Sequence, residues 1–145
     1  MNFEGLLYRA DGNTRANEKM FLQNLSATIV GGGFVKIKLP DGNNISMEAD
    51  SVLMFNMLLV GMNTTNREVV SFTGSAIFRR DNTNNTVQLK NVRGTDYAET
   101  SWAMSPVTYD WWADNTTEEI VIEIQDGFAR NSKWEALIYG VKCKI

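Results

Sequence analysis

Histidine is absent from the 145-residue sequence, and cysteine and proline are nearly absent, with one and two residues. Without histidine the chain lacks the commonest general base, the usual activator of a nucleophile and the commonest metal ligand. The single cysteine, Cys143, excludes an intramolecular disulfide and with it the small secreted proteins built on cysteine frameworks. We interpret Cys143 as a buried or interfacial thiol, because it lies at the end of an apolar segment.

Long apolar runs and a dominant charge are also missing. The longest apolar run, Val52–Val60, contains Asn56 and is too short to span a bilayer. The net charge is −3 with scattered Lys and Arg, so the basic footprint of a nucleic-acid binder is absent. The N-terminus has no basic segment followed by an apolar one, so we expect no signal peptide. We therefore expect a soluble protein, made in a cytoplasm, that binds neither nucleic acid nor membrane.

Composition and length fit one ordinary globular domain. Hydrophobic residues make up 43% and charged residues 21% of the chain, and a chain of this length can bury a core without disulfides or metals. Residues 1–19 are polar and turn-favouring, so we predict an N-terminal arm there and a folded domain over residues 20–145. The apolar patch of the arm consists of Phe3, Leu6, Leu7 and Tyr8.

Short apolar or alternating segments separated by turn residues predict an all-β fold. The turn signals lie at Gly31–Gly33, Pro40–Asn43, Asn63–Asn66 and Asp81–Asn85. We count eight or nine strands and no stretch with helical periodicity. A two-sheet antiparallel sandwich, jelly-roll-like, is the leading architecture, and an immunoglobulin-like sandwich is the alternative.

Three local predictions refine this picture. Phe34–Leu39 is expected to form a hairpin with Ile45–Ala49 across the turn at Pro40–Asn43. The unbroken apolar run Val52–Met62 favours a strand buried on both sides, with a helix as the competing interpretation. Gly74, in the middle of the strand predicted within Glu68–Arg80, indicates a bulge or a close backbone approach.

The C-terminal stretch Glu118–Ile145 predicts two strands of different character. In the first, Ile120, Ile122 and Ile124 alternate with mostly polar residues, which is typical of a strand with one buried face. In the second, Trp134–Val141, both alternating sets are apolar, so both faces need a cover. One cover is the chain's own core, and the other is a second layer of the fold or a neighbouring subunit.

Candidate chemistry is sparse. The acids available for a carboxylate pair, as in glycoside hydrolysis, are Glu99, Asp110, Asp114, Glu118 and Glu119. No spacing aims two of them at one point, and Asp110, Asp114 and Asn115 match no calcium-loop order. We predict no catalytic, cofactor or metal site.

Adjacent Trp111 and Trp112 are the most suggestive aromatic residues, because neighbours on a strand point to opposite faces. One of the two therefore faces away from the core of its own sheet. It is either an interface anchor, a platform on which a sugar stacks, or a side chain covered by a loop.

Five segments between Met54 and Val141 form an ordered pattern: LLVGMNTTNREVVSF, FTGSAIFRR, DNTNNTVQLKNV, WWADNTTEEIVIEIQDG and KWEALIYGV. In order and spacing this pattern resembles a type of virion protein domain of tailed bacteriophages, over about 60% of the chain. The sequence departs from that domain at Trp111 and Trp112, where one aromatic or aliphatic residue is typical, and the resemblance does not cover the arm.

The resemblance implies a trimeric jelly roll on a phage capsid or fibre, with no enzymatic activity and no cofactor. A fibre needs a shaft, and this chain passes from Met1 almost directly into the domain, so we expect a capsid decoration or cement protein on the virion surface. Such a homotrimer would bind across junctions of the major capsid protein. The predicted trimer interface comprises Trp111, Trp112, Trp134, Leu137, Tyr139 and Val141, and the predicted capsid-binding arm uses Phe3, Leu6, Leu7 and Tyr8.

Two rival functions stay open. A fibre-tip module that binds a receptor or a carbohydrate would use the region of Trp111 and Trp112. A small hydrolase would use a carboxylate pair such as Asp110 and Glu118.

Overall fold

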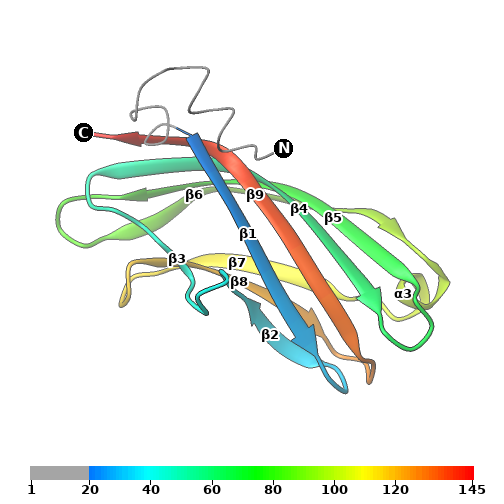
Figure 1. Cartoon of the computed structure of the whole chain (residues 1–145). Helices are drawn as coiled ribbons and strands as arrows, with labels where there is room; N and C mark the ends of the chain where they lie inside the picture. Colours follow the sequence, from blue (N-terminus) through cyan, green and yellow to red (C-terminus); the bar gives the residue numbers. More distant parts are fainter. Residues whose placement is uncertain (1–19) are drawn as a thin grey trace.

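The computed structural model describes residues 20–145, which form two antiparallel β-sheets packed face to face (Figure 1). The predicted arm, residues 1–19, lies outside the described residues. The larger sheet has the order β1 (Met20–Ile29), β9 (Ser132–Lys144), β4 (Ser51–Asn63), β5 (Val69–Arg80), β6 (Thr86–Ala98). In the smaller sheet β8 (Glu119–Asp126) pairs with β7 (Thr108–Asp114) on one edge and with β2 (Gly33–Ile37) and β3 (Ile45–Ser46) on the other.

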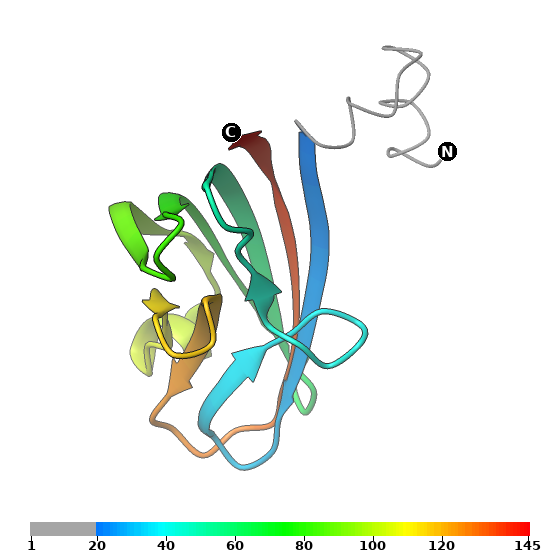
Figure 2. The same ribbon diagram turned by 90° about the vertical axis from the view of Figure 1, so that its left-hand side faces the viewer.

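The strand order confirms an all-β antiparallel sandwich. The first strands pair with the last ones, β1 with β9 and β2 with β8, which is a jelly-roll feature. Strands β4, β5 and β6 instead follow one another as a meander within the larger sheet. Figure 2 shows β1, β9 and β4 side by side in one layer.

The predicted hairpin between Phe34–Leu39 and Ile45–Ala49 is wrong in its pairing. The turn forms, since the Gly42 amide donates to the Leu39 carbonyl at 2.8 Å. Beyond it, however, β2 and β3 pair with successive parts of β8 and not with each other. The strong turn signal correctly predicts where the chain reverses. It does not predict the pairing, because β2 and β3 both pair with the longer apolar strand β8.

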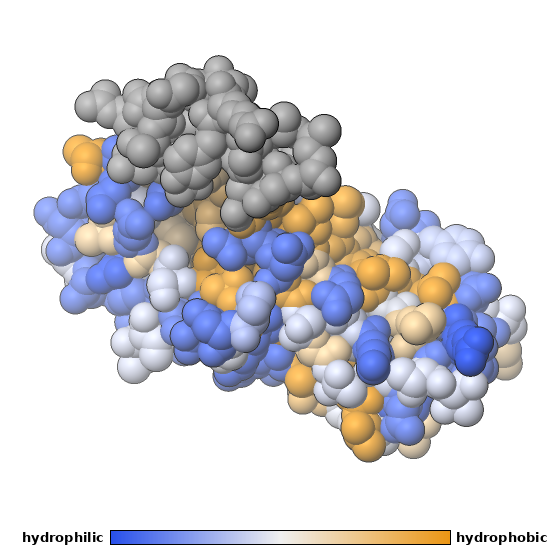
Figure 3. Space-filling view, in the orientation of Figure 1, coloured by the Kyte–Doolittle hydropathy of each residue, from blue (hydrophilic) through white to orange (hydrophobic). Residues whose placement is uncertain are grey.

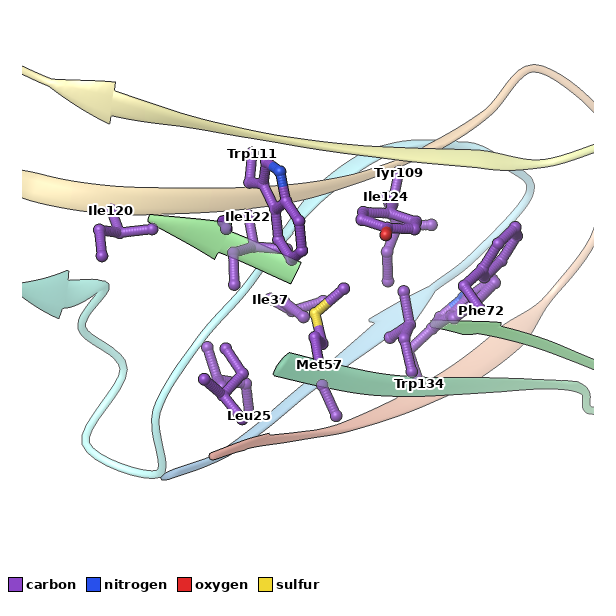
Figure 4. Close-up of a cluster of buried hydrophobic side chains, with 14 of the residues drawn as sticks. Leu25, Ile37, Met57, Phe72, Tyr109, Trp111, Ile120, Ile122, Ile124 and Trp134 are labelled. Carbon is purple, nitrogen blue, oxygen red and sulfur yellow. The ribbon is translucent and has the colours of Figure 1, made fainter. Parts of the chain in front are cut away.

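Side chains from the two sheets meet in one hydrophobic core (Figure 4). Ile120, Ile122 and Ile124 of β8 are buried, as their alternation predicts. They face Met57 of β4 and Trp134 of β9 across the sandwich, and these two are equally enclosed.

Aromatic rings fill the middle of that core. Trp111 of β7 packs edge-on against Phe55 of β4, with ring centroids 5.3 Å apart. Trp134 packs edge-on against Trp102 at 5.6 Å. Such edge-to-face pairs add about 0.5–1.5 kcal/mol each beyond the burial of their area. Large rings therefore join β4, β7 and β9 in one packed unit.

The connection between β6 and β7 differs from the irregular segment that the sequence predicts over Arg93–Ser105. Strand β6 continues to Ala98, and α3 (Thr100–Met104) follows it. Glu68 accepts hydrogen bonds from the Ser101 amide at 3.0 Å and from the Ser101 hydroxyl, and the Trp102 indole donates to the Glu68 carbonyl at 3.0 Å. A five-residue helix is thus fixed by its side-chain contacts to the neighbouring strand, because it is too short to be stable alone.

A buried ion pair secures the other side of α3. The Arg130 guanidinium binds the Asp126 carboxylate at 2.7 Å, with 8% and 0% of the two side chains exposed. The guanidinium also donates to the Ser105 carbonyl and stacks 4.1 Å from the Trp102 ring centroid. Because both charges are paired and hydrogen-bonded, their burial is compensated, and loss of either partner would leave a buried charge.

The run Val52–Met62 corrects a prediction. It forms β4, a strand, but its residues alternate strictly between buried and solvent-facing. Leu53, Phe55, Met57 and Leu59 enter the core, whereas the outward residues are not covered by other described residues. The predicted burial of the outward half is therefore wrong for residues 20–145, which place no second layer on that side of the larger sheet.

Gly74 is a close-approach site, one of the two predicted alternatives. A Cβ atom there would lie 2.3 Å from the Tyr109 hydroxyl and 2.8 Å from the Trp111 ring. The irregularities in β5–β6 pairing fall elsewhere, between Ser71 and Phe72 and between Ile77 and Phe78. The absent side chain of Gly74 makes room for the aromatic residues of β7.

Replacement of Gly74 by alanine should destabilise the domain by about 1–3 kcal/mol, because the added methyl group overpacks the core. The matched control is Gly94→Ala on the neighbouring strand, where a Cβ atom would meet only the Thr73 carbonyl oxygen at 4.0 Å. That control should stay within about 0.5 kcal/mol of wild type. Urea unfolding measures both, and equal effects of the two substitutions would contradict the close-approach interpretation.

Tyr109 gives the fold a dependence on alkaline pH. Burial raises the pKa of its phenol to about 12, and the hydroxyl donates to the Thr73 carbonyl at 3.3 Å. An unfolded tyrosine has a pKa of about 10. Between these values the unfolded chain releases a proton that the folded chain retains, so the free energy of unfolding falls as pH rises.

Tyr109→Phe should therefore flatten the decline in stability between about pH 10 and pH 12, because phenylalanine cannot ionise. Below about pH 9 the variant should differ from wild type by a constant amount, on the order of the 1 kcal/mol of the lost hydrogen bond. Denaturant unfolding at stepped pH values measures the difference. A parallel decline in both proteins would show that Tyr109 does not cause it.

Candidate interaction surface

The outer face of the larger sheet is mostly apolar along β4 and β9, although exposed Asn56 lies within it, opposite Tyr139. Register places Met54 of β4 beside Val141 of β9, and Leu58 beside Leu137. Met54, Leu58 and Val141 are 54%, 47% and 55% exposed. We call this surface the apolar face, formed by Met20, Leu22, Met54, Leu58, Val60, Met62, Leu137, Tyr139 and Val141.

The apolar face continues onto the edge strand β1, where Met20 pairs with Val141 and Leu22 pairs with Tyr139. In Figure 3 apolar side chains gather along the upper surface of the molecule, on the side where Figure 1 places β1, β9 and β4. Three strands at about 4.8 Å spacing and eight steps of about 3.4 Å give it a flat footprint of roughly 400 Å². Contiguous exposed patches of that size on soluble proteins commonly mark interaction sites.

A shallow apolar groove of about 300 Å³ crosses the apolar face at Leu58 and Leu137. Its rim is polar and carries Asn24, Ser71, Asp96 and Glu135. Lys133 and Glu135 point to the same side of β9 as Leu137 and lie opposite Met62 and Val60, so both signs of charge lie at one end of the face. An apolar centre with a mixed polar rim is the usual anatomy of a protein–protein interface.

The six residues predicted for a trimer interface lie in three different places. Tyr139 and Val141 are exposed on the apolar face, and Leu137 is partly exposed there. Trp111 and Trp134 are each 1% exposed, so this chain's own core encloses them and they present no surface to another copy. Their indole nitrogens are also bonded internally, Trp111 to Asn91 at 2.5 Å and Trp134 to Ser132 at 2.8 Å.

Of the adjacent tryptophans Trp111 and Trp112, Trp112 is the one that faces away from the core. It faces outward from the smaller sheet and is partly buried. Its cross-strand neighbour on that face is Val121, which is 1% exposed. Val121 also points outward, so Trp112 and Val121 lie side by side on the outer face of the smaller sheet. Trp112 therefore lies on the opposite side of the sandwich from Leu137, Tyr139 and Val141.

Sequence reasoning missed six of the nine residues of the apolar face. Met54, Leu58 and Val60 belong to the run that was interpreted as buried on both sides. The signal that reveals them is the same one used for Trp134–Val141, a strand with two apolar alternating sets. Cys143 is exposed at the end of β9, so it is not a buried thiol of this chain. Phe3, Leu6, Leu7 and Tyr8 of the predicted arm lie outside the described residues.

The candidate acids are dispersed over separate contacts. Glu118 accepts a hydrogen bond from the Thr86 hydroxyl, and Asp110 pairs with Arg93 at 2.7 Å. Glu99 accepts from the Val69 amide at 2.6 Å, while backbone amides of the following turn, first that of Thr116, lower the pKa of Asp114. Over residues 20–145 no three acidic or cysteine side chains are grouped as metal ligands would be. No helix in that range is long and apolar enough to cross a membrane.

No family model and no curated protein matches the chain. Among solved structures, a tailspike protein of Acinetobacter baumannii bacteriophage Fri1 is 10% identical, with a TM-score of 0.40 over 92% of this chain and 21% of the tailspike. The tailspike protein of Acinetobacter phage vB_ApiP_P1 is 12% identical, with a TM-score of 0.36 over 88% of this chain and 22% of that one. The chain thus spans about a fifth of each tailspike, and likenesses at this level assign it neither a family nor an activity.

One prediction is corrected by these neighbours. The resemblance to phage virion domains was taken to imply that the chain is not an enzyme. The Fri1 tailspike, a phage protein, is described as a capsular polysaccharide depolymerase, so a phage surface protein can be an enzyme. The inference from virion surface protein to absence of activity is therefore wrong.

Proposed function

We propose that the protein is a phage virion surface protein that associates with copies of itself through the apolar face. The observation that carries the proposal is the exposure of Leu58, Tyr139 and Val141 beside one another on a regular sheet. Water-exposed apolar side chains on a flat, rigid surface gain roughly 25 cal/mol per Å² when another surface covers them. A second copy is the occupant to which we commit.

The size of the apolar face supports a copy of the same chain as partner. A standard interface buries about 800 Å² per partner. The flat footprint of roughly 400 Å² corresponds to a larger accessible area once side-chain relief is included. Lys133 and Glu135 at the border offer charges of both signs, so a symmetry-related copy can meet each with its opposite.

The role on the particle follows from the sequence resemblance to trimeric phage virion domains. In a trimer the apolar faces lie toward the threefold axis, and the major capsid protein is the partner of the N-terminal arm. The protein then decorates the capsid and holds neighbouring capsid subunits together. A fibre-tip or receptor-binding module is the alternative role, and it uses the same self-association.

Val60→Lys should dissociate the assembly without unfolding the protomer. Val60 is 46% exposed on the apolar face, and its cross-strand neighbour on β9 is Glu135. A lysine there pairs with Glu135 in the isolated protomer but places a charge in the interface of the assembly. Light scattering coupled to size exclusion should give a trimer for wild type and a monomer for the variant.

The matched control is Val30→Lys, in the turn after β1, where the valine is 79% exposed and outside the apolar face. This control should keep the mass of wild type. A wild-type monomer at concentrations up to about 1 mM, the Kd of a very weak complex, would refute the proposal. So would a Val60→Lys variant with wild-type mass.

Deletion of residues 2–17 should separate self-association from particle binding. The shortened protein keeps β1 and the apolar face, so it should remain a trimer. It lacks Phe3, Leu6, Leu7 and Tyr8, so it should no longer co-sediment with particles that are stripped of the protein. Full-length protein is the positive control, and undiminished co-sedimentation of the deletion variant would show that the arm does not bind the capsid.

A further inference from the structure

A polar cleft of about 670 Å³ opens where the edge strands of the two sheets diverge, between β6 and β7. This volume lies within the roughly 300–1,000 Å³ of small-molecule sites. The cleft is separate from the apolar face, which lies on the outer side of the larger sheet.

The cleft exists because of how β6 pairs with β5. Asn91, Arg93 and Thr95 pair with Ala76, Gly74 and Phe72, so all three face the inner side of the larger sheet. Their partners are buried or nearly so, yet these three residues are exposed. The smaller sheet thus does not extend beneath this part of β6.

Two irregularities bound the same segment. The β5–β6 register shifts between Ser71 and Phe72 and again between Ile77 and Phe78, leaving Asp96 and Leu89 of β6 as the extra residues. Bulges at sheet edges re-aim side chains and are over-represented beside binding sites. Here they enclose the six residues from Lys90 to Thr95, of which Asn91, Arg93, Gly94 and Thr95 line the cleft.

An ion pair with unused hydrogen-bonding groups crosses the cleft. Arg93 Nη1 donates to the Tyr109 carbonyl at 2.8 Å and to Asp110 Oδ1 at 2.7 Å, and that same oxygen accepts from the Trp111 amide at 2.9 Å. Asp110 Oδ2 and the other guanidinium nitrogens have no hydrogen-bond partner within residues 20–145. Both side chains are about 40% exposed, at 42% and 39%.

The remaining lining is neutral and can both donate and accept. Thr95 and Thr108 contribute hydroxyl groups, and Asn91 and Gln125 contribute amides. Phe72 and Tyr109, packed edge-on with centroids 5.4 Å apart, form the floor. The charges of Arg93 and Asp110 cancel, so the cleft attracts neither a free anion nor a free cation strongly.

We propose that the cleft between β6 and β7 binds a neutral saccharide through two adjacent hydroxyl groups. One hydroxyl donates to Asp110 Oδ2, and its neighbour accepts from the Arg93 guanidinium. A carboxylate and a guanidinium held side by side match such a pair of hydroxyls, because one group accepts a hydrogen bond and the other donates one. The threonine and amide side chains then serve the other hydroxyls of the ring.

The test is a titration of the full-length, ¹⁵N-labelled protein followed by two-dimensional NMR. The probes are maltotriose, cellotriose and triacetylchitotriose, with inorganic phosphate as the anion probe. At least one trisaccharide should shift the amide signals of Arg93, Thr95 and Asp110 with a Kd of about 1 mM or below. Phosphate should shift them much less.

Asp110→Asn keeps the shape of the side chain and an oxygen for the Trp111 amide, but it removes the carboxylate charge. It should weaken binding of the same trisaccharide about tenfold, as expected for loss of a charged hydrogen-bond acceptor. The matched control is Asp41→Asn in the exposed turn after β2, where Oδ1 likewise accepts a backbone hydrogen bond, from Asn43 at 2.9 Å. The control should bind as wild type does.

Three results would overturn the proposal: no trisaccharide shifts the cleft signals at about 10 mM, tenfold above the expected Kd; phosphate binds as well as the trisaccharide; or Asp110→Asn binds as wild type does. Unperturbed signals elsewhere in the Asp110→Asn spectrum verify that the variant is folded. The oligomeric mass is unaffected by these variants, so failure here is distinguishable from failure of self-association through the apolar face.

Discussion

The antiparallel pairing of β4 with β9 is the constraint on which the rest of the structure depends. Each strand has 13 residues, and they pair along their whole length. Because side chains alternate strictly along paired strands, the register of this pairing fixes the face of every residue in both strands. The register that encloses Phe55, Met57, Trp134 and Ile138 in the core also leaves their apolar neighbours facing water.

The two outer surfaces of the sandwich consequently differ in chemistry. On the smaller sheet the outward positions are mostly polar, and Lys36 of β2 lies across from Glu123 of β8. Of the apolar residues there, Val121 is 1% exposed and lies beside Trp112 of the neighbouring strand, whereas Phe34 of β2 is 68% exposed. On the larger sheet several adjacent apolar residues, among them Met54, Leu58 and Val141, are not covered by other described residues. The outer side of the smaller sheet is therefore mostly polar, whereas that of the larger sheet carries a continuous apolar surface suited to contact with protein.

The sequence predicts well those features that depend on alternation alone. The burial of Ile120, Ile122 and Ile124, the two-faced character of Trp134–Val141 and the opposite orientations of Trp111 and Trp112 all follow from a period of two. Alternation does not reveal what covers a second apolar face, because the residue types are the same for a second layer and for a neighbouring copy. For that reason Val52–Met62 was interpreted as fully buried, and Trp111 and Trp134 were placed in an interface.

The sequence does not predict the cleft between β6 and β7, for a different reason. Arg93 and Asp110 are 17 residues apart in different strands, and only the pairing of each strand in its own sheet brings them together. The two register shifts in β6 leave no distinctive residue pattern, since Leu89 and Asp96 are ordinary strand or loop residues. Local sequence propensity specifies the strands. The register shifts between paired strands specify where the cleft forms. In this fold the alternation of residue types thus specifies the sheet faces, and the register of the paired strands specifies the cleft at the edge.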